Sequence, residues 1–85
     1  MQELNRKNIS YKIQLVSSTD PREFVWATSK AKYGVECKSG DRTVDGKSIL
    51  GVLSLNLSEP IVVTFHNVYG NEDFLKEMKR WEVED

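Results

Sequence analysis

The sequence contains only one cysteine, Cys37, and one histidine, His66, among its 85 residues. A lone cysteine cannot form an internal disulfide, which is typical of proteins from a reducing compartment. No pair of cysteines or histidines has the spacing of a zinc site, and no acidic loop has the pattern of an EF-hand, so we expect no metal and no cofactor. Neither residue supports a hydrolase, because no base lies near Cys37 in the sequence to generate a thiolate.

Long apolar runs and an excess of one charge are also missing. The net charge is −1, with acidic and basic residues interleaved, so no broad positive field is available to attract nucleic acid. The apolar runs are far shorter than the roughly 20 residues that cross a bilayer, and the N-terminal stretch lacks the apolar core of a signal peptide. We therefore expect a cytoplasmic protein that binds neither nucleic acid nor a membrane.

Proline and glycine are few, at two and five residues, and no low-complexity tract interrupts the chain. Hydrophobic residues make up 39% and charged residues 29%, a balance that is ordinary for a globular protein. A chain of this length has room for one compact domain, and we expect that domain to span residues 1–85.

The first half of the chain alternates between strand and helix patterns. Apolar residues at every second position of 9–15 predict a half-buried strand. Asp20 is the predicted N-cap of a helix, with Pro21 at its first position. Four residues share the predicted buried face of that helix, Phe24, Ala27, Thr28 and Ala31, and Trp26 lies off this face and is expected to be exposed.

The second half predicts three more strands and two more helices. Residues 33–38 and 43–45 form two short antiparallel strands around a turn, and residues 49–53 begin a brief helix. A strand follows within 59–68, and Asn71 is the predicted N-cap of a last helix whose buried residues are Phe74, Leu75, Met78 and Trp81. Because each strand has one apolar face, the pattern predicts an α+β fold, an antiparallel sheet covered by helices on one face.

Few side chains are suited to chemistry. Cys37 falls on an inward strand position, and we interpret it as a small core residue. His66 points away from the core in the strand pattern, and we interpret it as an exposed residue rather than a catalytic or metal-binding one. The sequence GKS at 46–48 resembles the end of a phosphate-binding loop, but the glycine that such a loop requires upstream would fall on Asp41.

Ser48 stands between a Gly-Lys pair and the apolar run that follows it. Its simplest role is the N-cap of the short helix, which contributes about 1 kcal/mol. Ser48 is otherwise a candidate for phosphorylation, because a phosphate there would meet helix-initial N–H groups beside Lys47.

The apolar run after Ser48 is too hydrophobic for a helix that buries only one side. Val52 and Leu55 can serve the core, whereas parts of Ile49, Leu50 and Leu53 must face water or a partner unless they close on Trp26. An exposed apolar patch beside a modifiable serine would suit protein docking.

The stretch DGKSILGVLSL, residues 45–55, resembles the serine-phosphorylation segment of HPr, the histidine-containing phosphocarrier of the bacterial sugar phosphotransferase system. The resemblance extends over about residues 9–81, with the same element order, FV at 24–25 at a matching distance from KS, and GNED at 70–73 before the last helix. It implies the HPr-like open-faced β-sandwich, with a four-stranded antiparallel sheet and three helices on one face.

The chain departs from HPr where the phosphorylated histidine belongs. The family pattern Gly-x-His-x-Arg-Pro is replaced by SSTDPRE, and ungapped alignment from FV places Ser17 at the histidine and Thr19 at the arginine. A serine phosphate ester is too stable to be passed on easily, so we expect no phosphocarrier activity and assign no catalytic residue. In lacking this histidine while keeping the serine, the chain resembles the catabolite-repression HPr homologues.

That resemblance implies a non-enzymatic regulatory or adaptor protein in sugar phosphotransferase or carbon-catabolite regulation. An enzyme similar to HPr kinase/phosphorylase would phosphorylate Ser48, and a regulatory protein would bind the product. The partner-binding residues would be Lys47, Ile49, Leu50, Leu53 and Trp26. Two alternatives stay open, a phosphocarrier that uses His66 and a binding module whose Ser48 is never modified. We expect a monomer or a weak dimer.

Overall fold

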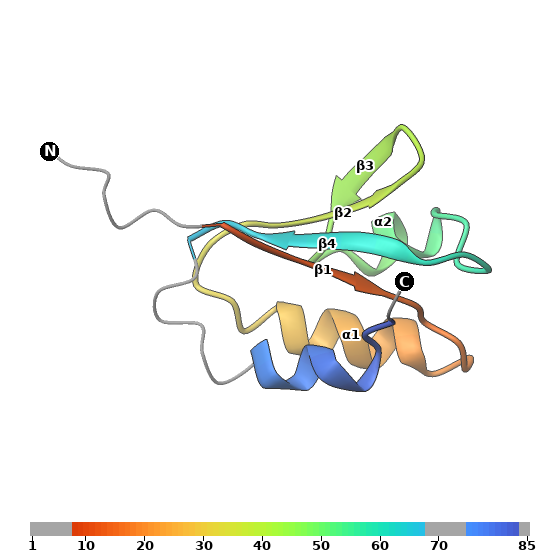
Figure 1. Cartoon of the computed structure of the whole chain (residues 1–85), viewed down its shortest axis with the longest axis horizontal. Coiled ribbons are helices and arrows are strands. Elements are labelled where there is room, and N and C mark those ends of the chain that lie inside the picture. The colour runs from red at the N-terminus through yellow and green to blue at the C-terminus, as the bar shows by residue number, and fades with distance from the viewer. Residues whose placement is uncertain (1–7, 68–74, 84–85) are drawn as a thin grey trace, which may run out of the picture.

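A computed structural model describes residues 8–67 and 75–83 (Figure 1). The elements follow the predicted order of strand, helix, strand, strand, short helix, strand and helix. They are β1 (Ile9–Ile13), α1 (Asp20–Thr28), β2 (Val35–Ser39), β3 (Arg42–Asp45), α2 (Ile49–Leu53), β4 (Ile61–Phe65) and the 3-10 helix η2 (Lys76–Arg80). The observed strands differ from the predicted ones at their ends. β1 ends two residues earlier and β2 begins two residues later than predicted, whereas β2 and β3 each extend one residue further into the turn between them.

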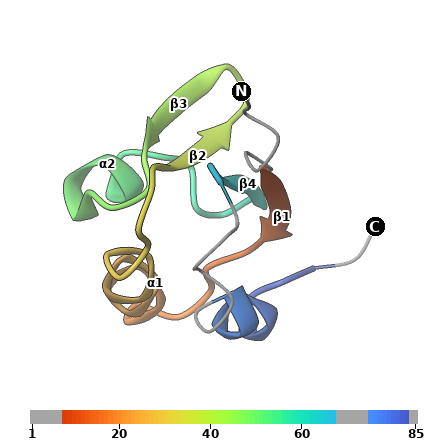
Figure 2. The same ribbon diagram turned by 90° about the vertical axis from the view of Figure 1, so that its left-hand side faces the viewer.

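The four strands form one antiparallel sheet in the order β1-β4-β2-β3. Phe65 of β4 pairs with Ile9 on one side and with Val35 on the other, and Cys37 of β2 pairs with Val44 of β3. Two views show α1 and η2 side by side against one face of the sheet, with α2 near β2 and β3 (Figures 1 and 2). The predicted α+β fold, an antiparallel sheet with helices on one face, is confirmed.

The core lies between the sheet and these helices. Its fully buried side chains include Ile13, Cys37, Ile61, Val63 and Phe65 from the strands, Phe24 and Thr28 from α1, Val52 from α2 and Met78 from η2. Phe24 and Trp81 meet edge to face, with ring centroids 5.9 Å apart, which joins α1 to the end of η2. The predicted inward positions of β2, β4 and α1 are buried as expected, as are Ile13 and Leu15, whereas Ile9 and Tyr11 of β1 are only half-buried.

The start of α1 differs from the prediction. Thr19 is the N-cap, and Asp20 is the first helical residue. The Asp20 carboxylate accepts hydrogen bonds from the backbone N–H groups of Val16 and Ser17, at 2.9 and 3.0 Å, and so closes the turn that precedes the helix. The prediction of Asp20 as the N-cap was wrong, because two donors in the preceding loop lie within reach of its short side chain.

The end of the chain was predicted only in part. The predicted N-cap Asn71 and the buried position Phe74 lie outside the described residues. Met78 and Trp81 are buried as predicted, but residues 76–80 form a 3-10 helix and not a regular α-helix. The chain then pairs with the edge of β1, since Gln14 N donates to Trp81 O and Val83 N donates to Lys12 O, and this contact was not predicted.

Candidate functional site

Ser48 is the N-cap of α2, as its position in the sequence predicted. Its backbone is extended, and its side-chain oxygen accepts a hydrogen bond from the N–H of Gly51 at 3.0 Å. The N–H of Val52 donates to the carbonyl of Ser48 at 2.9 Å and so begins the helix. Ser48 is half-buried, and the hydrogen bond that its hydroxyl oxygen accepts is partly buried.

A tight turn before Ser48 fixes its place. The N–H of Lys47 donates to the Asp45 carboxylate, and the N–H of Ser48 donates to the Asp45 carbonyl. Gly46 sits against β2, where its N–H donates to the carbonyl of Val35 at 2.7 Å. A Cβ atom at Gly46 would come within 2.6 Å of the Val35 side chain, so only glycine fits without movement.

Two side chains tie this turn to α1. The buried hydroxyl of Thr28 donates to the carbonyl of Gly46 at 2.6 Å. The ammonium of Lys47 donates to the carbonyl of Ala31, just beyond the end of α1, at 2.8 Å. Lys47 therefore holds the turn against α1 through one of the three N–H groups of its ammonium.

The apolar residues after Ser48 divide between core and surface as predicted. Val52 and Leu55 are buried, whereas Ile49, Leu50 and Leu53 are 38%, 78% and 53% exposed. We call these three exposed residues the α2 patch.

Trp26 is 66% exposed, so the α2 patch does not close over it. Instead, Trp26 and Ile49 line opposite sides of a hollow of about 470 Å³ between α1 and α2, together with Arg22, Val25 and Ser29. The patch and the tryptophan are thus two parts of one surface.

The turn before α1 carries no imidazole. Ser17, the residue at the expected histidine position, is exposed, and its hydroxyl lies 3.2 Å from that of Thr19. Its backbone N–H is used by the Asp20 carboxylate, and this hydrogen bond is the main cause that lowers the pKa of Asp20 to about 2. A carboxylate that stays ionised therefore occupies the backbone donors of this turn.

His66 follows β4 and lies far from Ser17. Its Nε2 is 3.3 Å from a carboxylate oxygen of Glu36, and both side chains are partly exposed, as expected for His66. The Glu36 contact could not be seen in the sequence, because it depends on the pairing of β2 with β4. His66 lies at the end of the sheet where Phe65 pairs with Ile9, whereas Ser17 follows the opposite end of β1.

Cys37 is fully buried, as predicted. Desolvation is the main cause that raises the pKa of its thiol to about 12, with a smaller contribution from the Asp45 charge. Over the ranges 8–67 and 75–83, no three His, Cys, Asp or Glu side chains are grouped as metal ligands. In the same ranges, no helix has the length and hydropathy of a membrane span.

Two solved structures share this arrangement of elements. HPr-C-His from Thermoanaerobacter tengcongensis aligns with a TM-score of 0.67 at 22% identity, over 87% of this chain and 88% of its own. The phosphocarrier protein HPr from Bacillus anthracis aligns with a TM-score of 0.62 at 19% identity, over 92% of this chain and 98% of its own.

The fold is HPr-like. No family model matches the sequence. The HPr-like fold agrees with the resemblance of residues 45–55, which lies in the turn and helix around Ser48.

The site brings together most of the residues expected from the sequence. Trp26 and Ile49 line one hollow between α1 and α2, Ser48 caps α2 beside Ile49, and His66 lies elsewhere. Sequence patterns missed Thr28 as an anchor for Gly46, since a threonine on a buried helix face is typical of packing alone. They also missed Arg22, which lines the hollow beside Trp26.

Proposed function

We propose that this protein is a non-enzymatic, HPr-like regulatory or adaptor protein of the cytoplasm. It is switched by phosphorylation of Ser48 and acts in sugar phosphotransferase or carbon-catabolite regulation. The observation that carries the proposal is the position of Ser48, a half-buried N-cap in an HPr-like fold that directly precedes the α2 patch.

Phosphorylation would change this surface strongly. A kinase transfers the γ-phosphoryl group of ATP to the Ser48 oxygen, ADP departs, and the hydroxyl proton leaves to a base of the kinase. The product carries a charge of about −1.5 to −2 and three strong acceptor oxygens. A partner that contacts Leu50 and Leu53 would meet this charge at the margin of an apolar contact, so its affinity depends on the modification.

The turn before α1 supports the absence of phosphocarrier activity. Ser17 offers a hydroxyl in place of an imidazole, and a phosphoserine ester does not transfer its phosphoryl group as readily as phosphohistidine. A phosphate at Ser17 would in addition lie beside the ionised Asp20 carboxylate, which already accepts the N–H of Ser17. Both features disfavour a phosphoryl relay at this position.

The decisive experiment is incubation with an HPr kinase and ATP, followed by intact-mass measurement. We expect the mass of one added phosphoryl group on the wild type and none on Ser48→Ala. Ser54→Ala is the matched control, because Ser54 lies at the other end of the same short helix and should leave the modification intact. An unmodified wild type, or equal phosphate on Ser48→Ala, would contradict the proposal.

A phosphocarrier that uses His66 is the second candidate. His66 is partly exposed and its Nε2 faces Glu36, so the ring is accessible and oriented. Treatment with phosphoenolpyruvate and the general phosphotransferase enzyme would place acid-labile phosphate on wild type but not on His66→Gln. No acid-labile phosphate on the wild type excludes this candidate.

A binding module with an unmodified Ser48 is the third candidate. A regulatory protein partner would then bind wild type and Ser48→Asp with equal affinity. The phosphorylation switch predicts different affinities for the wild type and its phosphorylated form, measured by calorimetry with the same partner.

A further inference from the structure

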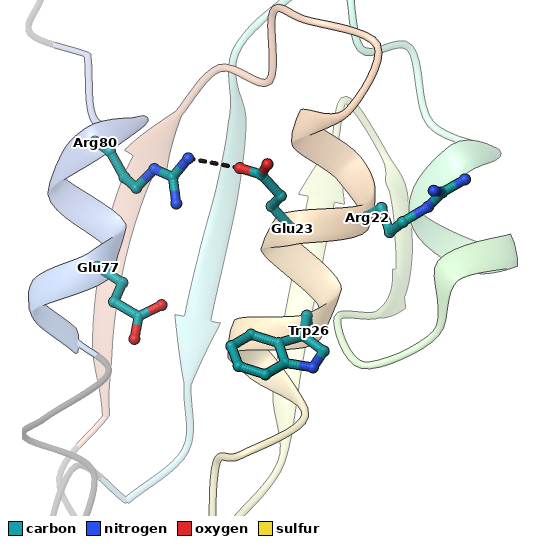
Figure 3. A pocket seen from close by; sticks show the side chains of 5 residues that line it. All are labelled: Arg22, Glu23, Trp26, Glu77 and Arg80. Atoms are coloured by element: carbon teal, nitrogen blue, oxygen red, sulfur yellow. Dashed lines mark hydrogen bonds and ion pairs between the residues drawn. The ribbon is translucent and has the colours of Figure 1, made fainter.

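A second hollow lies on the other side of Trp26, between α1 and η2 (Figure 3). It has a volume of about 420 Å³ and is lined by Arg22, Glu23, Trp26, Glu77 and Arg80. Arg22 and Trp26 also line the hollow between α1 and α2. These two residues therefore form a ridge with a depression on each side, and the α2 patch lies beyond one of them.

Ion pairs bridge α1 and η2 across the second hollow. Glu23 and Arg80 point toward each other across it (Figure 3). Lys30, two residues after the end of α1, pairs with Glu77 at 3.5 Å. The Lys30 ammonium also lies 4.0 Å from the centre of the Trp26 ring. Both carboxylates of this hollow are therefore already neutralised by cations, and one face of the indole is covered by a cation.

Among the described cations that line this hollow, Arg22 is the one without a carboxylate partner. Within residues 8–67 and 75–83 its guanidinium makes neither an ion pair nor a hydrogen bond, and Figure 3 shows it leaving α1 on the side away from Arg80. The ridge thus combines a large exposed aromatic ring with one uncompensated positive charge. Tryptophan and arginine, with tyrosine, are enriched among the residues that carry most of the binding energy in protein interfaces.

We propose that the Trp26–Arg22 ridge is a docking site for an acidic amphipathic segment of a protein partner. One large apolar side chain of that segment enters the hollow between α1 and η2 against Trp26, and a neighbouring aspartate or glutamate pairs with Arg22. The proposal rests on the proposed function only in that the protein acts by binding another protein, and it requires no phosphate on Ser48.

The charges argue against two other occupants. A basic segment would meet Lys30 on the Trp26 ring and Arg22 beside it, while Glu23 and Glu77 are already paired. In a twofold dimer the same surface faces itself, and the carboxylates of this hollow that one copy offers to Arg22 of the other, Glu23 and Glu77, are already paired. An acidic segment supplies the missing carboxylate and places no like charge on the ridge.

The test uses the unphosphorylated full chain and a phage-displayed library of random peptides as the probe. We expect the enriched peptides to share an aspartate or glutamate within one helical turn of a large apolar residue. A synthetic peptide of that consensus should bind at least about tenfold more weakly to Trp26→Ala and to Arg22→Gln than to the wild type. Lys38→Gln removes one exposed charge from β2 and should bind within about twofold of the wild type.

Several results would overturn the proposal. In the peptide selection, they are the absence of any enriched peptide and a basic consensus sequence. In the binding assay, they are an affinity unchanged in Trp26→Ala or Arg22→Gln and an equal loss of affinity in Lys38→Gln. In sedimentation, it is self-association of the wild type that Trp26→Ala abolishes. Circular dichroism of the two ridge variants must match the wild type, as expected for exposed helix positions. The peptide assay uses the unphosphorylated protein, and Ser48→Ala should bind the peptide with the affinity of the wild type. A failure of peptide binding is therefore distinct from a failure of Ser48 phosphorylation.

Discussion

Replacement of Thr28 by valine tests whether α1 holds the Ser48 segment in place. Valine has nearly the same shape as threonine, so the change removes the hydroxyl that donates to the carbonyl of Gly46 and leaves the packing almost unaltered. Thr28 is fully buried, and water cannot replace the lost donor. The carbonyl of Gly46 therefore loses this partner in the variant.

The expected cost follows from that unpaired carbonyl. A buried acceptor that loses its donor destabilises a protein by about 1–3 kcal/mol. In a domain of this size, 1 kcal/mol lowers the melting temperature by about 4–8 °C. We therefore expect Thr28→Val to melt at least about 4 °C below the wild type, although valine is the more hydrophobic residue.

Two measurements separate this bond from ordinary packing. Thr28→Ser keeps the hydroxyl and loses one methyl group, so it should keep the amide chemical shifts of Gly46, Lys47 and Ser48 close to those of the wild type. Thr28→Val should shift these amides and speed hydrogen exchange at the N–H of Gly51, which donates to Ser48. A valine variant as stable as the wild type would refute the reasoning, as would exchange at Gly51 that does not change.

Three further predictions concern single positions. Ser48→Ala should lower the free energy of unfolding by about 1 kcal/mol through the lost cap, while Ser48→Asp should cost only a few tenths, as chemical denaturation would show. The pKa of Asp20 is lowered to about 2 in the folded state, so its carboxylate stabilises the protein above about pH 4, and this contribution is lost as the pH falls toward 2. After allowance for solvent screening, the contribution of the Asp20 carboxylate to the free energy of unfolding is about 1 kcal/mol. Asp20→Asn lacks this contribution, so in urea titrations its free energy of unfolding should fall less than that of the wild type between pH 4 and pH 2. Gly46→Ala should lower the stability measured by thermal unfolding by about 1–3 kcal/mol, because the added Cβ would overlap the Val35 side chain. Gly34→Ala is the control, and it should be tolerated because a Cβ there meets the His66 ring at an ordinary contact distance of 3.5 Å.

The strands and the first helix could be predicted because their patterns report burial directly. Ile61, Val63 and Phe65 alternate with outward residues, and a sheet with one covered face requires that alternation. The exposure of Trp26 was predictable for a similar reason, since it lies off the buried stripe of α1. Ser48 was predictable as a cap because its side chain acts on residues only three positions away.

The contacts that place the site could not be predicted, because they join residues far apart in the sequence. Thr28 reaches Gly46 and Lys47 reaches Ala31 only after α1 has packed beside the turn. The error at Asp20 has a local cause, since aspartate can accept from the preceding loop as well as from the helix, and the sequence does not decide between them. The hollow between α1 and η2 depends on how these two elements pack, which no periodic pattern encodes.

The anchors around Ser48 bear on how a phosphate would act. The bonds that hold the turn come from Thr28, Lys47 and the backbone of Gly46, and none of them uses the Ser48 side-chain oxygen. A phosphate on that oxygen would weaken at most the cap to Gly51, so the fold around it should persist. Phosphorylation would then act by changing the charge beside Leu50 and Leu53, and a partner would detect that charge on a surface whose shape is already set.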